Sequence, residues 1–259
     1  MNSLLLLIEG EDELRPLVKD LNATPVHGAT GYFEVVLPNE TRVILVTTGV
    51  GPEQAYQVTL TAIQHFNPGY VLSAGTCGAL IDGLSIGDWV VTGNVRSIGK
   101  PSENWPTLRS LQSPDSESVQ RFGQCLNDKL NWHQGRLVTV SNEPVHGLHA
   151  KLDIATRHEA IAVDMESFGI ARAAMEQSLP WIVARVVVDT PTWPLPELGA
   201  MNVQTGRPPL SGIVKYVLLN PFVGPRILYS LWALVKVYAC RLAEVLPDFT
   251  ADSVSSERL

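Results

Sequence analysis

Three ionisable residues lie at or near the ends of strongly apolar stretches late in the chain. Glu166 follows AIAVDM, and Arg185 and Asp189 belong to WIVARVVVD. A charged side chain in an apolar strand costs free energy unless it has a partner or a function. Two explanations are open at this point. The three groups form a mutual ion-pair network at the sheet ends, or they form a site whose chemistry needs acids and a cation.

A second group of acidic residues follows the first apolar stretch, Leu4 to Ile8. Glu9 is followed by Gly10, and Glu11, Asp12 and Glu13 then open a helical pattern. Acidic residues at the start of a helix complement the helix dipole, which gives them a structural explanation. One of them is also a candidate for catalysis.

A glycine-rich stretch, AGTCGAL, ends the apolar segment that begins at Val71. We expect the strand to break at Gly75-Thr76-Cys77-Gly78, because glycines without a Cβ let the backbone come close to a ligand. Ligands of open α/β sheets bind at such strand ends. An ordinary tight turn explains the same residues.

Strand and helix patterns alternate along the chain, which predicts a mixed or parallel sheet covered by helices on both faces. The segment Val95 to Leu108 is expected to be a polar surface loop. The expected strands include Leu4 to Ile8, Val35 to Leu37, Val43 to Thr47, Arg136 to Val140, Ala160 to Ser167 and Trp181 to Val188, and the later helices Ser116 to Asn131 and Ala150 to Arg157.

Composition narrows the class of protein. With 259 residues, 45% of them hydrophobic, the chain can form one large domain, and no linker-like segment divides it. A net charge of -7 and a pI near 5.4 argue against a nucleic-acid partner. The widely spaced Cys77, Cys125 and Cys240 suit reduced thiols of a cytoplasmic protein better than disulfides or a metal site. We therefore expect no metal and no cofactor.

Two apolar segments could suggest membrane insertion, but neither pattern supports it. Leu4 to Ile8 is short and has no basic residues before it, so a buried first strand is expected. In Val217 to Leu246, prolines and charged residues interrupt the apolar run, which favours an amphipathic helix that packs on the protein.

The motifs in combination resemble the purine nucleoside phosphorylase and nucleosidase superfamily. The resemblance rests on AGTCGAL-x-DGL-x-IGDWVV, then AVDMES, then R-x-x-x-D, and covers roughly residues 1 to 190. The pattern is most similar to the methylthioadenosine and S-adenosylhomocysteine nucleosidase branch. It implies a three-layer α/β sandwich with a mixed, twisted central sheet flanked by helices, and a homodimer.

The resemblance also assigns roles to individual residues. It implies that Asp189 protonates the purine and that Glu13 activates the attacking water, which Arg185 helps to hold. Met165 and Glu166 match the residues that bind the ribose. The other substrate-binding candidates are Thr76, Cys77, Gly78 and Glu143, the last in the loop Ser141 to His146.

These residue types suit cleavage of an N-glycosidic bond. The sugar becomes positive and the base negative, so an acid beside the base and a carboxylate beside a water divide the work, as in glycoside hydrolysis. Burial in its apolar strand would keep Asp189 protonated. Val188 departs from the family pattern, because a serine usually precedes this aspartate. A phosphorylase would have an arginine where this chain has Ser73, although Arg15 could match a second phosphate-binding arginine.

The chain continues after Asp189 with a proline-rich segment and two apolar helices. Residues 190–259 resemble the carboxyl-terminal extension of hopanoid-associated phosphorylase-like members of the superfamily. Trp193, Leu195 and Leu198 could form a lid over the far end of the sugar, and packing at a subunit interface or over the sheet explains the segment at least as well.

Three functions are compatible with these features. The first is hydrolysis of a purine nucleoside, an adenine nucleoside with a modified 5′ group, in nucleoside catabolism or salvage. The second is phosphorolysis by the same fold. The third is a nucleoside-binding protein without turnover, which would be favoured if Asp189 faced away from the pocket.

Overall fold

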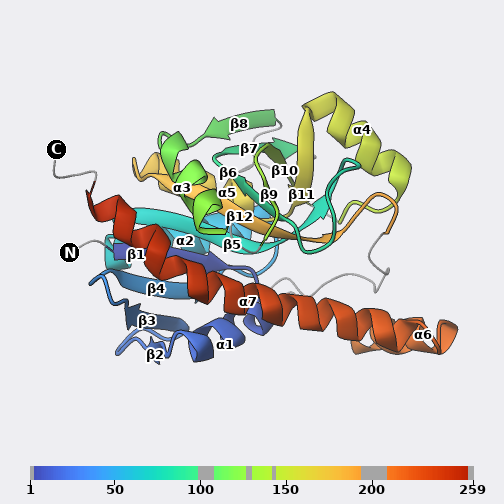
Figure 1. The fold of residues 1–259 in the computed structure, drawn as a ribbon, viewed down its shortest axis with the longest axis horizontal. Helices are drawn as coiled ribbons and strands as arrows, with labels where there is room; N and C mark the ends of the chain where they lie inside the picture. The colour runs from blue at the N-terminus through green and yellow to red at the C-terminus, as the bar shows by residue number, and fades with distance from the viewer. Residues whose placement is uncertain (1–2, 99–107, 127–129, 142–143, 194–208, 256–259) are drawn as a thin grey trace.

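The structure of the chain is a computed structural model that describes residues 3–98, 108–126, 130–141, 144–193 and 209–255. Its centre is a mixed β-sheet (Figure 1). The strands are β1 (Ser3–Ile8), β2 (Thr24–Pro25), β3 (Tyr32–Val36), β4 (Arg42–Thr47), β5 (Tyr70–Ala79), β6 (Trp89–Thr92), β7 (Asn94–Ile98), β8 (Leu108–Gln112), β9 (Trp132–His133), β10 (Arg136–Val140), β11 (Ala160–Asp164) and β12 (Trp181–Asp189).

Parallel strands form the middle of the sheet. β1 lies between β4 and β5 and is parallel to both, and β12 pairs in parallel with β5. β11 meets only the end of β5 and runs antiparallel to it, at Val163 and Ala162 opposite Gly78 and Ala79. This arrangement brings the carboxyl ends of β1, β5, β11 and β12 to one edge of the sheet, where binding sites of such folds lie.

Helices cover both faces of the sheet, which confirms the predicted three-layer α/β class. In β1, Leu5 and Leu7 face one apolar cluster and Leu4, Leu6 and Ile8 face the other, as the alternation of a strand requires. α2 and α5 pack in the first cluster, and α1, α3 and α7 pack in the second. The helices are α1 (Glu11–Asp20), α2 (Pro52–Phe66), α3 (Ser116–Leu126), α4 (Leu148–His158), α5 (Ser167–Glu176), α6 (Leu210–Leu219) and α7 (Gly224–Ser255).

The expected break at Gly75-Thr76-Cys77-Gly78 is wrong, because β5 continues through all four residues to Ala79. The strand is held there by β12, whose residues Arg185 to Asp189 pair with Gly75 to Gly78. The glycines instead make room for side chains of β12 and its surroundings. A Cβ on Gly75 would lie 3.4 Å from both Arg185 and Glu9, and one on Gly78 would lie 2.6 Å from Asp189.

The expected surface loop at Val95 to Leu108 is also wrong in part. Asn94–Ile98 forms β7 between β10 and β8, and Leu108 begins β8. Residues 99–107 between these strands lie outside the described residues. The strand was not expected because its inward positions include Ser97, which is 1% exposed although it is polar.

The two predicted carboxyl-terminal helices are confirmed as α6 and α7. The second half of α7 packs into the core through residues that include Tyr238, Leu242 and Phe249. The first half of α7, with α6 beside it, projects beyond the rest of the molecule (Figure 1). Within the described part of the chain, none of the helices combines the length and apolar character that a membrane crossing requires.

Candidate active site

A cavity of about 260 Å³ lies at the edge of the sheet where β1, β5, β11 and β12 end. Its lining is acidic, and the described residues that line it include no lysine and no arginine. The acidic lining residues are Glu9, Asp12, Glu13, Asp164, Glu166 and Asp189.

Asp189 lies at the end of β12, in the wall of this cavity, and is 6% exposed. The register between β12 and β5 shifts between Val187 and Asp189, a bulge of the kind that redirects a side chain. The predicted burial of Asp189 is confirmed. The structure adds a partner that was not predicted, since Lys151 of α4 donates a hydrogen bond to Oδ2 of Asp189 and forms an ion pair with it.

Glu13 lies in the first turn of α1 and lines the same cavity as Asp189. Burial raises the pKa of Glu13 well above its ordinary value, and the nearby charge of Glu9 raises it further, while Arg185 acts in the opposite direction. Glu9 comes directly after β1, and its Oε2 accepts a hydrogen bond from Oγ1 of Thr76 at 3.2 Å. Two carboxyl groups therefore stand on the side of the cavity where the water-activating carboxylate was expected.

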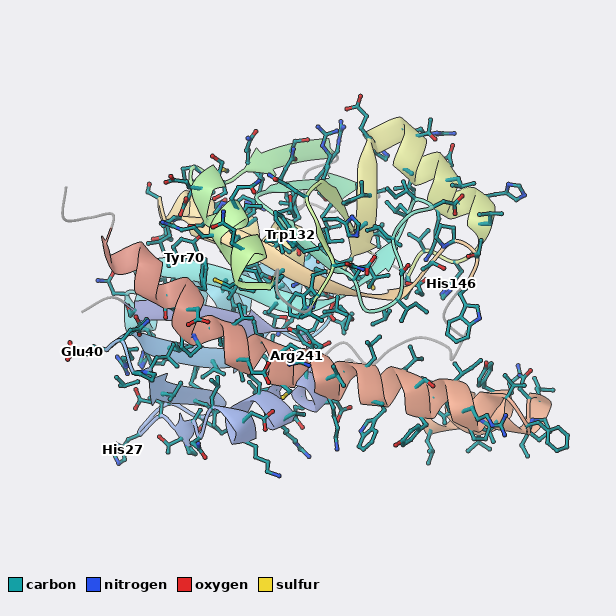
Figure 2. All side chains as sticks on the ribbon, in the orientation of Figure 1. His27, Glu40, Tyr70, Trp132, His146 and Arg241 are labelled. Carbon is teal, nitrogen blue, oxygen red and sulfur yellow. The ribbon has the colours of Figure 1, made fainter. Side chains whose placement is uncertain are left out.

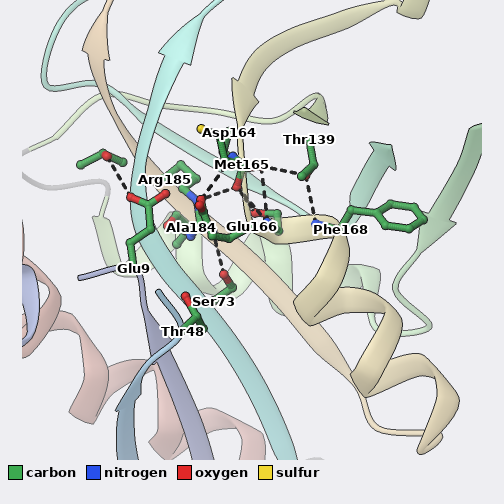
Figure 3. Close-up of polar contacts among 12 residues, drawn as sticks. Glu9, Thr48, Ser73, Thr139, Asp164, Met165, Glu166, Phe168, Ala184 and Arg185 are labelled. Atoms are coloured by element: carbon green, nitrogen blue, oxygen red, sulfur yellow. Dashed lines mark hydrogen bonds and ion pairs between the residues drawn. The ribbon is translucent and has the colours of Figure 1, made fainter. Parts of the chain in front are cut away.

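Arg185 lies behind the cavity wall and is not among the residues that line it. Its Nε donates to Oδ2 of Asp164 at 3.0 Å, and its Nη2 donates to Oγ of Ser73 at 2.8 Å (Figure 3). Burial alone would lower the pKa of Arg185, but the charges of Asp164, Glu9 and Glu166 raise it. Its predicted contact with the attacking water stays a prediction.

The mutual ion-pair network of Glu166, Arg185 and Asp189 is not found among the described contacts. Arg185 pairs with Asp164, and Asp189 pairs with Lys151. Asp164 is well satisfied, because it also accepts hydrogen bonds from the hydroxyls of Thr139 and Ser167. The charges at the strand ends are thus divided between two separate buried pairs.

Glu166 lines the cavity between β11 and α5 and is 1% exposed. The backbone N–H of Gly51 donates to its Oε1 at 2.9 Å, and the N–H of Met165 donates to its Oε2 at 3.2 Å. Burial raises the pKa of Glu166 well above its ordinary value, and the nearby Glu9 adds to this effect. Met165, the other predicted ribose contact, lines the same cavity.

The predicted binding residues Thr76, Cys77 and Gly78 also line the cavity. Burial raises the pKa of the Cys77 thiol well above its ordinary value, so Cys77 is a packing residue and not a nucleophile. Glu143 lies outside the described residues, as do Leu195 and Leu198. From the same loop as Glu143, His146 lines the cavity and is labelled in Figure 2.

Sequence reasoning assigned no role to three carboxylates of the cavity lining, Glu9, Asp12 and Asp164, or to Lys151 behind it. Lys151 had a detectable signal, because it precedes Ile154 and Ala155 by three and four positions and therefore shares their helix face. Those two residues pack against the apolar cluster beneath α4. The described residues contain no group of three or more His, Cys, Asp or Glu side chains placed to hold a metal ion.

Relatives of this chain include nucleosidases. The 5′-methylthioadenosine/S-adenosylhomocysteine nucleosidase of Staphylococcus epidermidis is 29% identical over 189 residues, which are 69% of this chain and 82% of the relative. The enzyme of the same description from Staphylococcus saprophyticus is 25% identical over 159 residues, 58% of this chain and 70% of the relative.

Solved structures share the fold over almost the whole chain. The S-adenosylhomocysteine nucleosidase of Streptococcus pyogenes superposes with a TM-score of 0.70 at 21% identity and covers 97% of each chain. The futalosine hydrolase of Helicobacter pylori superposes with a TM-score of 0.70 at 15% identity and covers 97% of this chain and 99% of its own. A sequence model of the phosphorylase superfamily matches residues 4–200. This chain therefore belongs to the phosphorylase superfamily.

Proposed function

We propose that this protein is an N-glycosidase that hydrolyses the bond between the base and the ribose of an adenine nucleoside. The observation that carries the proposal is that Asp189 and Glu13 line one cavity, together with Glu166. In this arrangement Asp189 protonates the departing base, Glu13 takes the proton of the attacking water, and Glu166 accepts hydrogen bonds from the ribose hydroxyls. The named activities of the nucleosidase relatives support the same reaction.

The charge of the cavity favours water over phosphate as the nucleophile. Cleavage of an N-glycosidic bond builds positive charge on the sugar, which carboxylates stabilise. A phosphate anion would instead need convergent cationic or amide donors. Arg15, the candidate phosphate ligand, has 70% of its side chain exposed, pairs with Glu11 and does not line the cavity.

The remaining lining suits an apolar substituent at the 5′ position of the sugar. Val50, Val140, Val145 and Val235 line the cavity, the last from α7. Asp189 lines the cavity, so the observation that would favour a protein without turnover is not made.

We also propose that the chain is a cytoplasmic homodimer and that residues 1–259 form one domain with 190–259 as its extension. The wide spacing of Cys77, Cys125 and Cys240 in the sequence and the family resemblance support the first statement. The packing of α7 into the same core as β1 supports the second. Analytical ultracentrifugation tests the dimer, and a monomer at micromolar concentration would contradict it.

The defining experiment follows base release from 5′-methylthioadenosine, S-adenosylhomocysteine and adenosine by chromatography, with and without phosphate. We expect adenine release that does not depend on phosphate, with the free sugar as the other product. Release that requires phosphate and yields a sugar 1-phosphate would establish the phosphorylase instead. Nucleoside binding without release would establish the protein without turnover.

The ribose role of Glu166 predicts a selective effect on binding. Glu166→Ala should raise KM for ribosides about 10- to 100-fold, because a hydrogen bond to a charged group contributes about 1.5–3 kcal/mol. The effect on 2′,3′-dideoxy analogues should be much smaller, since they lack the hydroxyls. Steady-state kinetics with both substrates measures this difference.

Asp12→Ala is the matched control for Glu166→Ala, because Asp12 is another carboxylate of the cavity lining. It should change KM for the two substrate classes alike. An equal effect of Glu166→Ala on ribosides and dideoxy analogues would remove the ribose role of Glu166.

A further inference from the structure

Helix α4 buries a lysine while two of its leucines are exposed. Lys151 is 1% exposed, whereas Leu148 and Leu152 of the same helix are 42% and 38% exposed. A lysine is almost never fully buried unless it is paired. Positions where a sequence breaks such a local rule are concentrated at functional sites.

The ammonium group of Lys151 is directed at one target. Within the described part of the chain, the hydrogen bond given for it goes to Oδ2 of Asp189. Oδ1 of the same carboxylate is the atom that a Cβ on Gly78 would approach to 2.6 Å, and that Cβ would lie 3.3 Å from Nζ of Lys151. Gly78 and Asp189 line the cavity, whereas Lys151 does not. The lysine therefore lies behind the carboxylate and reaches a bound base only through it.

The two buried ion pairs of the site differ in how completely they are satisfied. Arg185 is surrounded by acceptors, namely Asp164, Ser73 and the carbonyl of Ala184. A lysine ammonium has three donors, and the hydrogen bond given for Lys151 goes to the carboxylate of Asp189. Val188, the residue before Asp189, has no hydroxyl that could relay a proton. Lys151 is thus placed to pass a proton to Asp189, whereas the donors of Arg185 are directed at other acceptors.

We propose that Lys151 is a positioning residue that supplies, through Asp189, the proton taken by the departing base. This inference rests on the proposed nucleosidase function. As the bond between C1′ and the base breaks, its electron pair stays with the base. The imidazole nitrogen of the base takes a proton from Asp189 while Asp189 takes one from the Lys151 ammonium.

The proton balance closes over one turnover. Water adds to C1′ and gives its proton to Glu13, so the products are the neutral base and the free sugar. Lys151 is then a neutral amine and Glu13 a neutral acid. The site resets when Glu13 releases its proton to solvent and Lys151 takes one up.

The test compares an adenine nucleoside with its N7-methylated counterpart, whose base already carries positive charge and leaves without a proton. Lys151→Met should lower kcat for the unmethylated nucleoside on the order of 10²-fold, the size of a general-acid contribution. It should change kcat for the methylated nucleoside little. An equal loss on both substrates would overturn the proposed proton relay from Lys151 through Asp189 to the base. It would show only a structural role for Lys151.

A double-mutant cycle shows whether Lys151 acts through Asp189. Asp189→Asn and the double variant Lys151→Met/Asp189→Asn should lose the same factor in kcat on the unmethylated nucleoside, since residues that act as a unit are not additive. The double variant also removes both buried charges, so it keeps the test valid if Lys151→Met alone unfolds. Additive losses would overturn the relay.

The wild-type protein separates the two proposals. Base release from both nucleosides, with the selective losses above, supports both. Release from the methylated nucleoside alone would overturn the relay and leave the hydrolase. Release from neither would refute the proposed function, and the relay with it.

Discussion

Asp189→Asn should lower kcat for release of adenine on the order of 10²- to 10⁴-fold, the usual contribution of a general acid. An amide cannot carry the proton that the departing base requires. The side chain keeps nearly the same shape, so a bound nucleoside should still fit the cavity. Base release by chromatography and nucleoside affinity by calorimetry measure the two effects separately.

The same substitution should also destabilise the protein, because it removes the partner of a buried lysine. Breaking a buried ion pair by removing one partner costs about 3–5 kcal/mol. Lys151 is 1% exposed, so water cannot replace the lost carboxylate without a rearrangement of α4. Thermal unfolding followed by circular dichroism should therefore accompany the kinetics, and Lys151→Met/Asp189→Asn should recover stability but not activity.

Retained activity in Asp189→Asn would assign the acid to another residue. His146 is the first alternative, since it lines the cavity and lies in the loop before α4. His146→Ala is accordingly the matched control. It should leave most of kcat intact if Asp189 is the acid.

The ends of the central strands could be predicted because buried parallel strands have a clear sequence signature. LLLLI is apolar throughout and WIVARVVV is apolar except for Arg185, so the charged residues that follow or interrupt these strands stand out. Asp189 and Glu166 were found in this way, whereas Glu13 was singled out by the family resemblance. Their placement in one cavity follows because the carboxyl ends of these strands lie at the same edge of the sheet.

The course of β5 could not be predicted from its own residues. Two glycines separated by two residues, Gly75 and Gly78, are compatible with a turn and with a strand that accommodates close neighbours. The pairing with β12 and the contacts of Arg185 and Asp189 decide between these, and they come from a segment more than 100 residues later. For Lys151, the helix period of α4 indicates the buried face, but the partner that makes burial of the charge possible, Asp189, comes from β12.

Glu13→Gln should remove most hydrolysis and at the same time stabilise the protein above the ordinary pKa of glutamate. The loss of kcat should be on the order of 10²- to 10⁴-fold, because the amide cannot take the proton of the attacking water. For the wild type, the rate should rise with pH through the pKa of Glu13, which burial and the charge of Glu9 have raised. Base release measured across pH tests both statements.

The gain in stability follows from the sign of the same shift. A carboxyl group whose pKa is higher in the folded than in the unfolded protein favours folding below its unfolded pKa, and this contribution is lost as pH rises through the folded value. A glutamine at position 13 does not ionise, so Glu13→Gln removes the destabilisation that ionised Glu13 causes at neutral pH. The free energy of unfolding at neutral pH should therefore increase by about 1 kcal/mol, the size usual for a stabilising substitution at an active site. Near pH 4 the two proteins should differ little.

Glu9→Gln is the matched control for Glu13→Gln, because Glu9 lines the same cavity. A large loss of activity in Glu9→Gln with normal activity in Glu13→Gln would move the base to Glu9, and normal activity in both would favour phosphate as the nucleophile.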